Sequence, residues 1–322
     1  MTPPPPPPPP PSTFRRFGTG RRIDPALDDE ALRTARDALA QGHWTEARGL
    51  LLATGGDRDR RGHRCTVLAA APAAESWARE WRLTEPDSAD AAVLLACATA
   101  LRAARGKRSP EAARDAIAAA VQAAPTDPTP WLALLLLFRA TSPPGSPDDC
   151  RYAFEELRAR HPEHHHAHHL MAAVLAESGS ASERDTDVYE FAVEAAESAP
   201  ADSPLALLPV VAHAERHRVL AAAREAAPDP TGSGHWRNRQ ARRHVRAAFD
   251  WWLEWGAEDH GPRRLHDLNF LAHAKFHEGR MAEAAALFQR IGPYVTPEPW
   301  SYTGRDPRKA FRAAHRASLG AV

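Results

Sequence analysis

Several kinds of residue that would point to a particular class of protein are scarce in this chain of 322 residues. There are three cysteines, Cys65, Cys97 and Cys150, and they lie far apart with no Cys-x-x-Cys spacing. This argues against a disulfide framework or a zinc knuckle and is typical of a reduced, cytoplasmic protein. No purely apolar run is longer than the eight residues at 131–138. That is far short of the roughly 20 residues of a membrane-spanning helix.

An excess of charge is also missing. The 41 basic residues balance 41 acidic residues, so the formal net charge is zero. Proteins that bind nucleic acid through its phosphates normally carry a basic excess. We therefore expect no nucleic-acid partner and, in the absence of an apolar span, no membrane partner.

Sequence motifs of enzyme active sites are absent too. Residues 231–234 (Thr-Gly-Ser-Gly) lack the spacing and the lysine of a phosphate-binding loop, and neither a Gly-x-Ser-x-Gly elbow nor a His-Glu-x-x-His pattern occurs. Nothing in the sequence resembles a nucleophile with a paired base. The sequence therefore predicts no catalytic residue and no cofactor, and it makes a binding protein the first interpretation and an enzyme the second.

The chain begins with an unusual excess of proline. Residues 3–11 are nine consecutive prolines, followed by a basic stretch that contains glycine. Proline cannot donate a backbone hydrogen bond, and the segment has too few apolar residues to bury a core. We therefore expect residues 1–26 to form a disordered, extended tail and residues 27–322 to form the folded domain.

Four further prolines recur at nearly even spacing: Pro86, Pro125, Pro162 and Pro200. The gaps between them are 39, 37 and 38 residues, and each proline follows an alanine-rich, helix-like stretch and opens a short polar break. A period of this length is typical of stacked helical hairpins. The sequence therefore predicts an all-α fold built from repeated helix pairs.

The residues inside the repeats follow a recurring pattern of small and large side chains. One repeat reads Trp131-x2-Leu134-Leu135-x2-Phe138, Cys150-x3-Phe154 and then Pro162, and the last reads Leu268-x2-Leu271-Ala272, Gly279 and Ala284-x3-Phe288. Small residues let two helices cross closely, and large apolar residues fill the adjoining space. A glycine after the first helix permits the positive φ of the turn.

These motifs resemble the tetratricopeptide repeat in a degenerate form, and the chain as a whole is similar to uncharacterised tetratricopeptide-like proteins of actinobacteria. The resemblance implies a right-handed α-solenoid of about seven helix pairs over residues 28–300, followed by a closing turn and a C-terminal capping helix near residues 306–318. It also implies that the concave face of the solenoid binds a protein or a peptide.

One stripe of polar residues in the last repeat is the candidate partner-binding surface. The stripe consists of four residues whose numbers advance by three or four, namely His266, Asn269, His273 and His277. Such residues share one face of a helix, and in the tetratricopeptide frame that face lines the concave groove. An asparagine among apolar neighbours needs hydrogen-bond partners, so a bond to a neighbouring loop is the alternative role for Asn269.

Two groups of residues are candidates for a metal site. The alternative to a peptide-binding scaffold is a metal- or small-molecule-binding enzyme site in the C-terminal repeats, formed by His266, Asp267, His273 and His277. In addition, six histidines lie between residues 161 and 169, and pairs such as His165 and His169 are one helical turn apart. No carboxylate or cysteine follows this run at a fixed spacing, so the sequence predicts no metal ligands there.

Truncation tests the predicted tail. Deleting residues 1–22 is expected to leave the melting temperature unchanged within about 2 °C, because a lost packing interaction would shift it further. The measurement is thermal denaturation followed by circular dichroism. A larger decrease would show that this segment packs against the folded domain.

Overall fold

The computed structural model describes residues 23–140, 145–178, 181–257 and 260–320. These residues form fifteen α-helices and three short 3-10 helices, with no β-strand in the described ranges. The first eight are α1 (Glu30–Ala40), α2 (Trp44–Thr54), α3 (Arg58–Ala69), α4 (Ala74–Thr84), α5 (Ala89–Ala104), α6 (Pro110–Ala123), α7 (Thr129–Ala140) and α8 (Pro147–Arg158). They are followed by α9 (His165–Glu177), α10 (Ala181–Ser198), η1 (Pro204–Leu207), α11 (Leu208–Ala222), η2 (His235–Arg237), α12 (Arg239–Trp255), α13 (Arg264–Glu278), α14 (Met281–Ile291), η3 (Tyr302–Gly304) and α15 (Pro307–Gly320). The predicted all-α class is confirmed.

The four evenly spaced prolines lie in links between helices, as the sequence predicts. They fall between α4 and α5, α6 and α7, α8 and α9, and α10 and η1. Serine side chains cap helix starts: Ser88, which follows Pro86, accepts a hydrogen bond from the backbone N–H of Ala91, and Ser146 at the start of α8 forms a capping box with Asp149. These caps satisfy backbone donors that a helix start leaves without an intrahelical partner.

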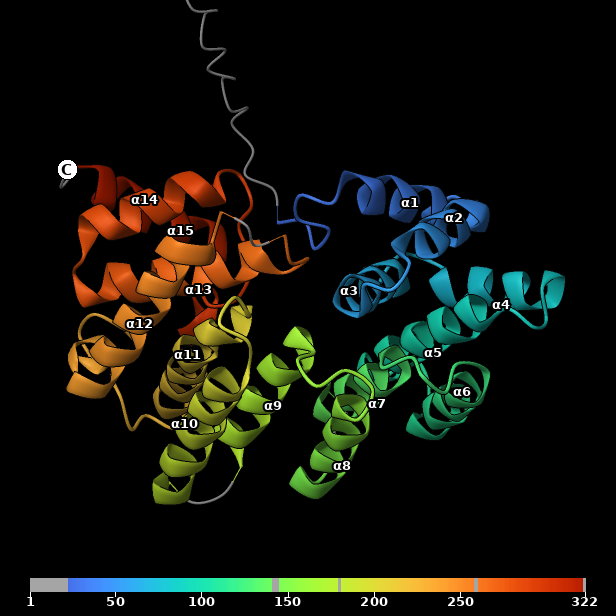
Figure 1. Ribbon diagram of the computed structural model, residues 1–322, viewed down its shortest axis with the longest axis horizontal. Coiled ribbons are helices and arrows are strands. Elements are labelled where there is room, and N and C mark those ends of the chain that lie inside the picture. The colour runs from blue at the N-terminus through green and yellow to red at the C-terminus, as the bar shows by residue number, and fades with distance from the viewer. Residues whose placement is uncertain (1–22, 141–144, 179–180, 258–259, 321–322) are drawn as a thin grey trace, which may run out of the picture.

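The helices pack in two layers. From α1 to α13 each odd-numbered helix contacts the next odd-numbered helix, and each even-numbered helix packs against the odd-numbered helices before and after it. The helices follow one another around an arc from α1 through α5, α7 and α9 to α13 (Figure 1). Most residues of α5 are buried, whereas α6 buries only Ala113, Ile117 and Ala120. The odd-numbered helices therefore form the inner layer, since only helices covered on several sides are apolar all round.

Two turns within these pairs require glycine. Gly42, between α1 and α2, has a φ of 99°, and Gly279, between α13 and α14, has a φ of 93°. A β-carbon on Gly42 would also lie 2.8 Å from the ring of Trp77. Any other residue at position 42 would therefore meet both backbone strain and a steric clash.

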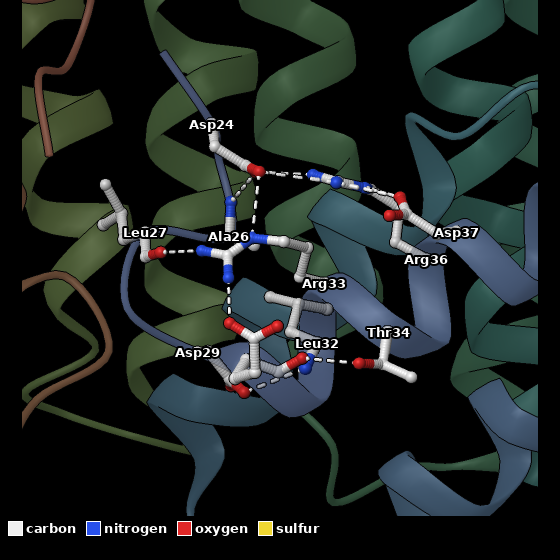
Figure 2. A network of polar contacts seen from close by, with 10 residues as sticks. Asp24, Ala26, Leu27, Asp29, Leu32, Arg33, Thr34, Arg36 and Asp37 are labelled. Atoms are coloured by element: carbon white, nitrogen blue, oxygen red, sulfur yellow. Dashed lines mark hydrogen bonds and ion pairs between the residues drawn. The ribbon is translucent and has the colours of Figure 1, made fainter. Parts of the chain in front are cut away.

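The folded domain begins earlier than the sequence suggests. The predicted tail lies outside the described residues up to residue 22, but Asp24 and Ala26, which were assigned to it, are packed. Arg33 and Arg36 of α1 both donate to the Asp24 carboxylate, and Arg33 also donates to the carbonyl of Leu27 (Figure 2). Ala26 is fully buried. The boundary at residue 26 was set by composition, whereas ion pairs to the following helix hold this segment in place.

This N-terminal segment brings the first and the last helices of the arc together. Ala26 packs in the hydrophobic core of the N-terminal half, and its neighbour Leu27 packs in the core of the C-terminal half. Arg264 of α13 forms an ion pair with Asp28, and Arg60 of α3 donates to the carbonyl of His260 at 2.7 Å.

In the described part of the chain, no helix combines the length and apolar composition needed to span a bilayer.

A buried arginine joins three successive inner helices. Arg61 of α3 donates to Asp127 at 2.5 Å and to Asp90 at 2.6 Å. Asp127 in turn accepts a hydrogen bond from the backbone N–H of Thr129 in the first turn of α7. The arginine side chain therefore fixes α3 against the starts of both α5 and α7.

Replacing this arginine tests how much the inner layer depends on it. Arg61→Met is expected to lower the free energy of unfolding by about 3–5 kcal/mol, because it leaves a buried carboxylate without its partner. The measurement is urea denaturation. The matched control is Arg246→Met, whose exposed ion pair with Asp250 contributes at most about 1 kcal/mol. Equal effects of the two substitutions would contradict the role of Arg61.

Candidate functional site

The inner helix layer encloses a pocket of about 830 Å³, which we call the central pocket. All six inner helices from α3 to α13 contribute to its wall, and the segments 23–27 and 295–302 complete it. Part of the wall is apolar: Leu101, Leu136, Leu170, Val211 and Phe270 come from five different helices. The volume is within the range of pockets that hold a drug-sized ligand.

A group of histidines and one arginine forms the polar part of the wall. The histidines are His63 of α3, His166 and His169 of α9 and His266 of α13, and the arginine is Arg263 at the start of α13. The rings of His169 and His266 lie 5.5 Å apart between centroids. These residues bring together three helices that are far apart in sequence.

Asp59 holds the start of α9 against α3. Its carboxylate accepts hydrogen bonds from the backbone N–H of His165 and from Nε2 of His161, both at 2.9 Å. Burial raises the pKa of this carboxyl, but the bond from His161 and the charges of neighbouring histidines outweigh burial and lower the pKa to about 2. The carboxylate is therefore charged at neutral pH and complements the positive end of the α9 dipole.

Most of the histidines around the central pocket are neutral. Burial lowers the pKa of His63 to about 3 and that of His164 to about 4. The pKa values of His169 and His266 are also lowered well below the usual value, chiefly by burial. A neutral imidazole offers one donor and one acceptor nitrogen. Nε2 of His63 and Nδ1 of His266 have no hydrogen-bond partner among the described residues.

Arg263 is the positive charge in this part of the pocket. Its guanidinium contacts Nε2 of His266 at 3.1 Å, and its Nε has no hydrogen-bond partner in the described part of the structure. Within the described ranges no carboxylate forms an ion pair with it, whereas Arg139 and Arg218 of the same pocket both pair with Glu177. Burial lowers the pKa of Arg263, but arginine stays protonated in proteins. Arg263 therefore has no direct ion pair in the described ranges, although the charges of Asp267, Glu298 and Asp59 act on it from farther away.

The four residues that the sequence predicts as one recognition surface do not share a surface. His266 lines the central pocket, while His273 and His277 line a second pocket of about 570 Å³ that also contains Thr231 and Arg305. Nδ1 of His277 lies 2.6 Å from the hydroxyl of Thr231. The alternative enzyme site is divided in the same way, because Asp267 and His266 lie apart from this second pocket.

Asn269 lies inside the protein. Its side chain is 0% exposed, its Nδ2 donates to the carbonyls of Leu265 and Tyr294, and its Oδ1 accepts a hydrogen bond from Nε1 of Trp300 at 2.8 Å. These bonds attach the loop after α14 to α13. The hydrogen bonds to a neighbouring loop, weighed as the alternative from sequence, are therefore the ones that form, and a partner has no access to this side chain.

Sequence reasoning missed several residues of the site. His63 and Arg263 belong to no motif, and the carboxylates that approach the histidine run, Asp59 and Asp267, lie about 100 residues before and after it. A search for ligands at fixed local spacing does not find them. The one signal in the sequence is that the histidines of α9 stand next to alanine, leucine and methionine, a composition typical of a buried helix.

No protein-family model, curated protein or solved structure matches this chain. The site is therefore interpreted from its own geometry. Two features define it: Arg263 in the central pocket, which has no direct ion pair within the described ranges, and the approach of the α9 histidines to Asp267.

The role of Asn269 can be tested by mutation. Asn269→Ala is expected to lower the free energy of unfolding by about 2–3 kcal/mol, because it leaves the buried Trp300 Nε1 without a partner and removes the side-chain bond to the carbonyl of Tyr294. Urea denaturation measures the change. In a double-mutant cycle with Trp300→Phe, we expect a coupling energy of about 1 kcal/mol or more. Independent effects of the two substitutions would show that this hydrogen bond does not stabilise the protein.

Proposed function

We propose that this chain is a tetratricopeptide-like helical-repeat protein that binds a short peptide segment in the central pocket, with a carboxylate of the peptide at Arg263. The finer architecture, a right-handed solenoid with its concave side inward, is part of this proposal. It is supported by the even spacing of the repeats and by the layered packing of successive helix pairs.

The observation that carries this function is the state of Arg263. Placing an arginine inside a partly apolar pocket without a carboxylate partner costs free energy. A carboxylate ligand would recover that cost, because guanidinium and carboxylate form charge-assisted, often bidentate hydrogen bonds. Neutral histidines beside Arg263 add hydrogen-bonding groups without competing charge.

The shape of the pocket favours a short ligand over a folded domain. Its volume of about 830 Å³ suits a drug-sized molecule or a few residues of a peptide. Apolar side chains of α5, α7 and α11 lie on its wall together with the polar groups of α3, α9 and α13. An extended peptide presents the same combination, since apolar side chains alternate along it with backbone donors and acceptors.

Peptide libraries test this function. Random peptides with a free C-terminal carboxylate, and a matched amidated library, are screened against the purified chain, and selected peptides are titrated by fluorescence anisotropy. We expect Arg263→Met to weaken binding by about 10- to 100-fold, which corresponds to the loss of a hydrogen bond to a charged group. Amidation of the peptide is expected to have a similar effect, and the two changes together should cost little more than one.

Two controls make the result specific. Arg263→Lys keeps the charge and is expected to retain part of the affinity, and the distant Arg246→Met should bind as the wild type does. If no peptide is enriched, or if Arg263→Met binds acid and amide peptides with unchanged affinity, the proposed function is wrong.

A further inference from the structure

Two histidines of α9 and one aspartate of α13 converge beside the central pocket, whose wall includes His169. Nε2 of His165 lies 2.9 Å from Oδ2 of Asp267, and Nε2 of His169 lies 3.3 Å from Oδ1. One potential ligand atom from each residue lies within 4.8 Å of the other two. The spacing of His165 and His169, four residues apart on one helix, places both rings on the same face.

Nε2 of His165 and Nε2 of His169 approach different oxygens of the same Asp267 carboxylate. The rings stand 4.3 Å apart at an angle of 43°. The direction in which a ring nitrogen binds a metal ion is also the direction of its N–H bond. A bound ion would therefore take the place of a proton on these nitrogens and would share the carboxylate with them.

The distances and donor types suit a divalent transition metal. Zn²⁺ binds imidazole nitrogen and carboxylate oxygen at about 2.0–2.2 Å in tetrahedral sites, so its ligand atoms stand about 3.4 Å apart. Two nitrogens and one oxygen match the preferences of zinc better than those of magnesium or calcium, which take oxygen ligands. The single carboxylate charge of Asp267 also complements a dication.

Burial and access are both compatible with a bound ion. The side chains of His165, His169 and Asp267 are 6%, 6% and 3% exposed, so bulk water does not solvate the donors. His169 at the same time lines the central pocket. An ion can therefore enter from the pocket, and a fourth coordination position would face it.

We propose that His165, His169 and Asp267 form a binding site for a divalent transition metal ion, with zinc as the best match. A three-residue site of this kind leaves one coordination position for water or a ligand in the central pocket. The metal site does not depend on the proposed peptide ligand, because both can be measured separately.

Zinc titration of untagged protein tests the site. The chain is purified without a metal column, stripped with EDTA and dialysed, and zinc binding is followed by calorimetry and by competition with a chromophoric chelator. We expect one equivalent to bind with a Kd below 1 μM, on the order expected for a buried site with three protein ligands. In Asp267→Asn the affinity is expected to fall by at least about 100-fold, more than the loss of a residue that only orients a ligand.

A control within the histidine run separates this site from unspecific binding. His161→Gln removes a histidine that contacts Asp59 and lies outside the cluster, and it should bind zinc as the wild type does. If it weakens binding as much as Asp267→Asn does, the zinc is held by the histidine run in general and the proposed site is wrong.

Two further measurements keep the test decisive if Asp267→Asn does not fold. His169→Gln then takes its place, with circular dichroism as the check of folding. Zinc X-ray absorption of the wild-type complex counts the ligands, and two imidazoles with oxygen ligands support the site, whereas three or more imidazoles contradict it. Failure of the stripped wild-type chain to bind zinc would show that His165 and Asp267 form a structural ion pair instead.

Discussion

The arrangement of this protein depends on how the histidine-rich start of α9 is buried. A helix start exposes backbone N–H groups, and this one also carries imidazoles that would be costly to bury without polar partners. Asp59 of α3 accepts hydrogen bonds from the backbone of His165 and the ring of His161, while Asp267 of α13 approaches His165 and His169 from the other side. Two carboxylates from opposite halves of the chain thus meet one helix, and the arc of helices bends around it.

Burial within this arc of helices sets the charge states of the residues that line the central pocket. Because the histidines on its wall are buried, their pKa values are lowered and they stay neutral, and Arg263 keeps its charge among them. The pocket wall therefore combines neutral imidazoles and apolar side chains with charged groups of both signs, namely Arg105, Arg139, Arg218, Arg263, Asp24, Glu215 and Glu298.

The two proposed sites share one wall without sharing their defining groups. His169 belongs both to the metal cluster and to the central pocket, whereas Arg263 contacts His266 and lies outside the cluster. An ion at the cluster would add positive charge beside Arg263 and increase the attraction for an acidic ligand, because opposite charges interact strongly in a partly buried site. The second pocket, with His273, His277 and Arg305, shares Tyr302 with the central pocket.

The sequence by itself determined the helical class, the links at Pro86, Pro125, Pro162 and Pro200, and the glycine turn after α13. Each of these is recorded in a local pattern, since helix periodicity, caps and turn residues act over a few positions. It also predicted a disordered segment that extends to residue 26 and one continuous recognition stripe on α13. In the structure the end of that segment is packed, and the residues of the stripe lie in two different pockets and in the protein interior. Only the tertiary structure decided that Asn269 holds a loop, that Asp24 and Ala26 are packed, and that Asp59 and Asp267 reach the α9 histidines. The physical reason is distance along the chain: these carboxylates and histidines are about 100 residues apart, and their approach depends on the curvature that many helix pairs accumulate, which no short motif encodes.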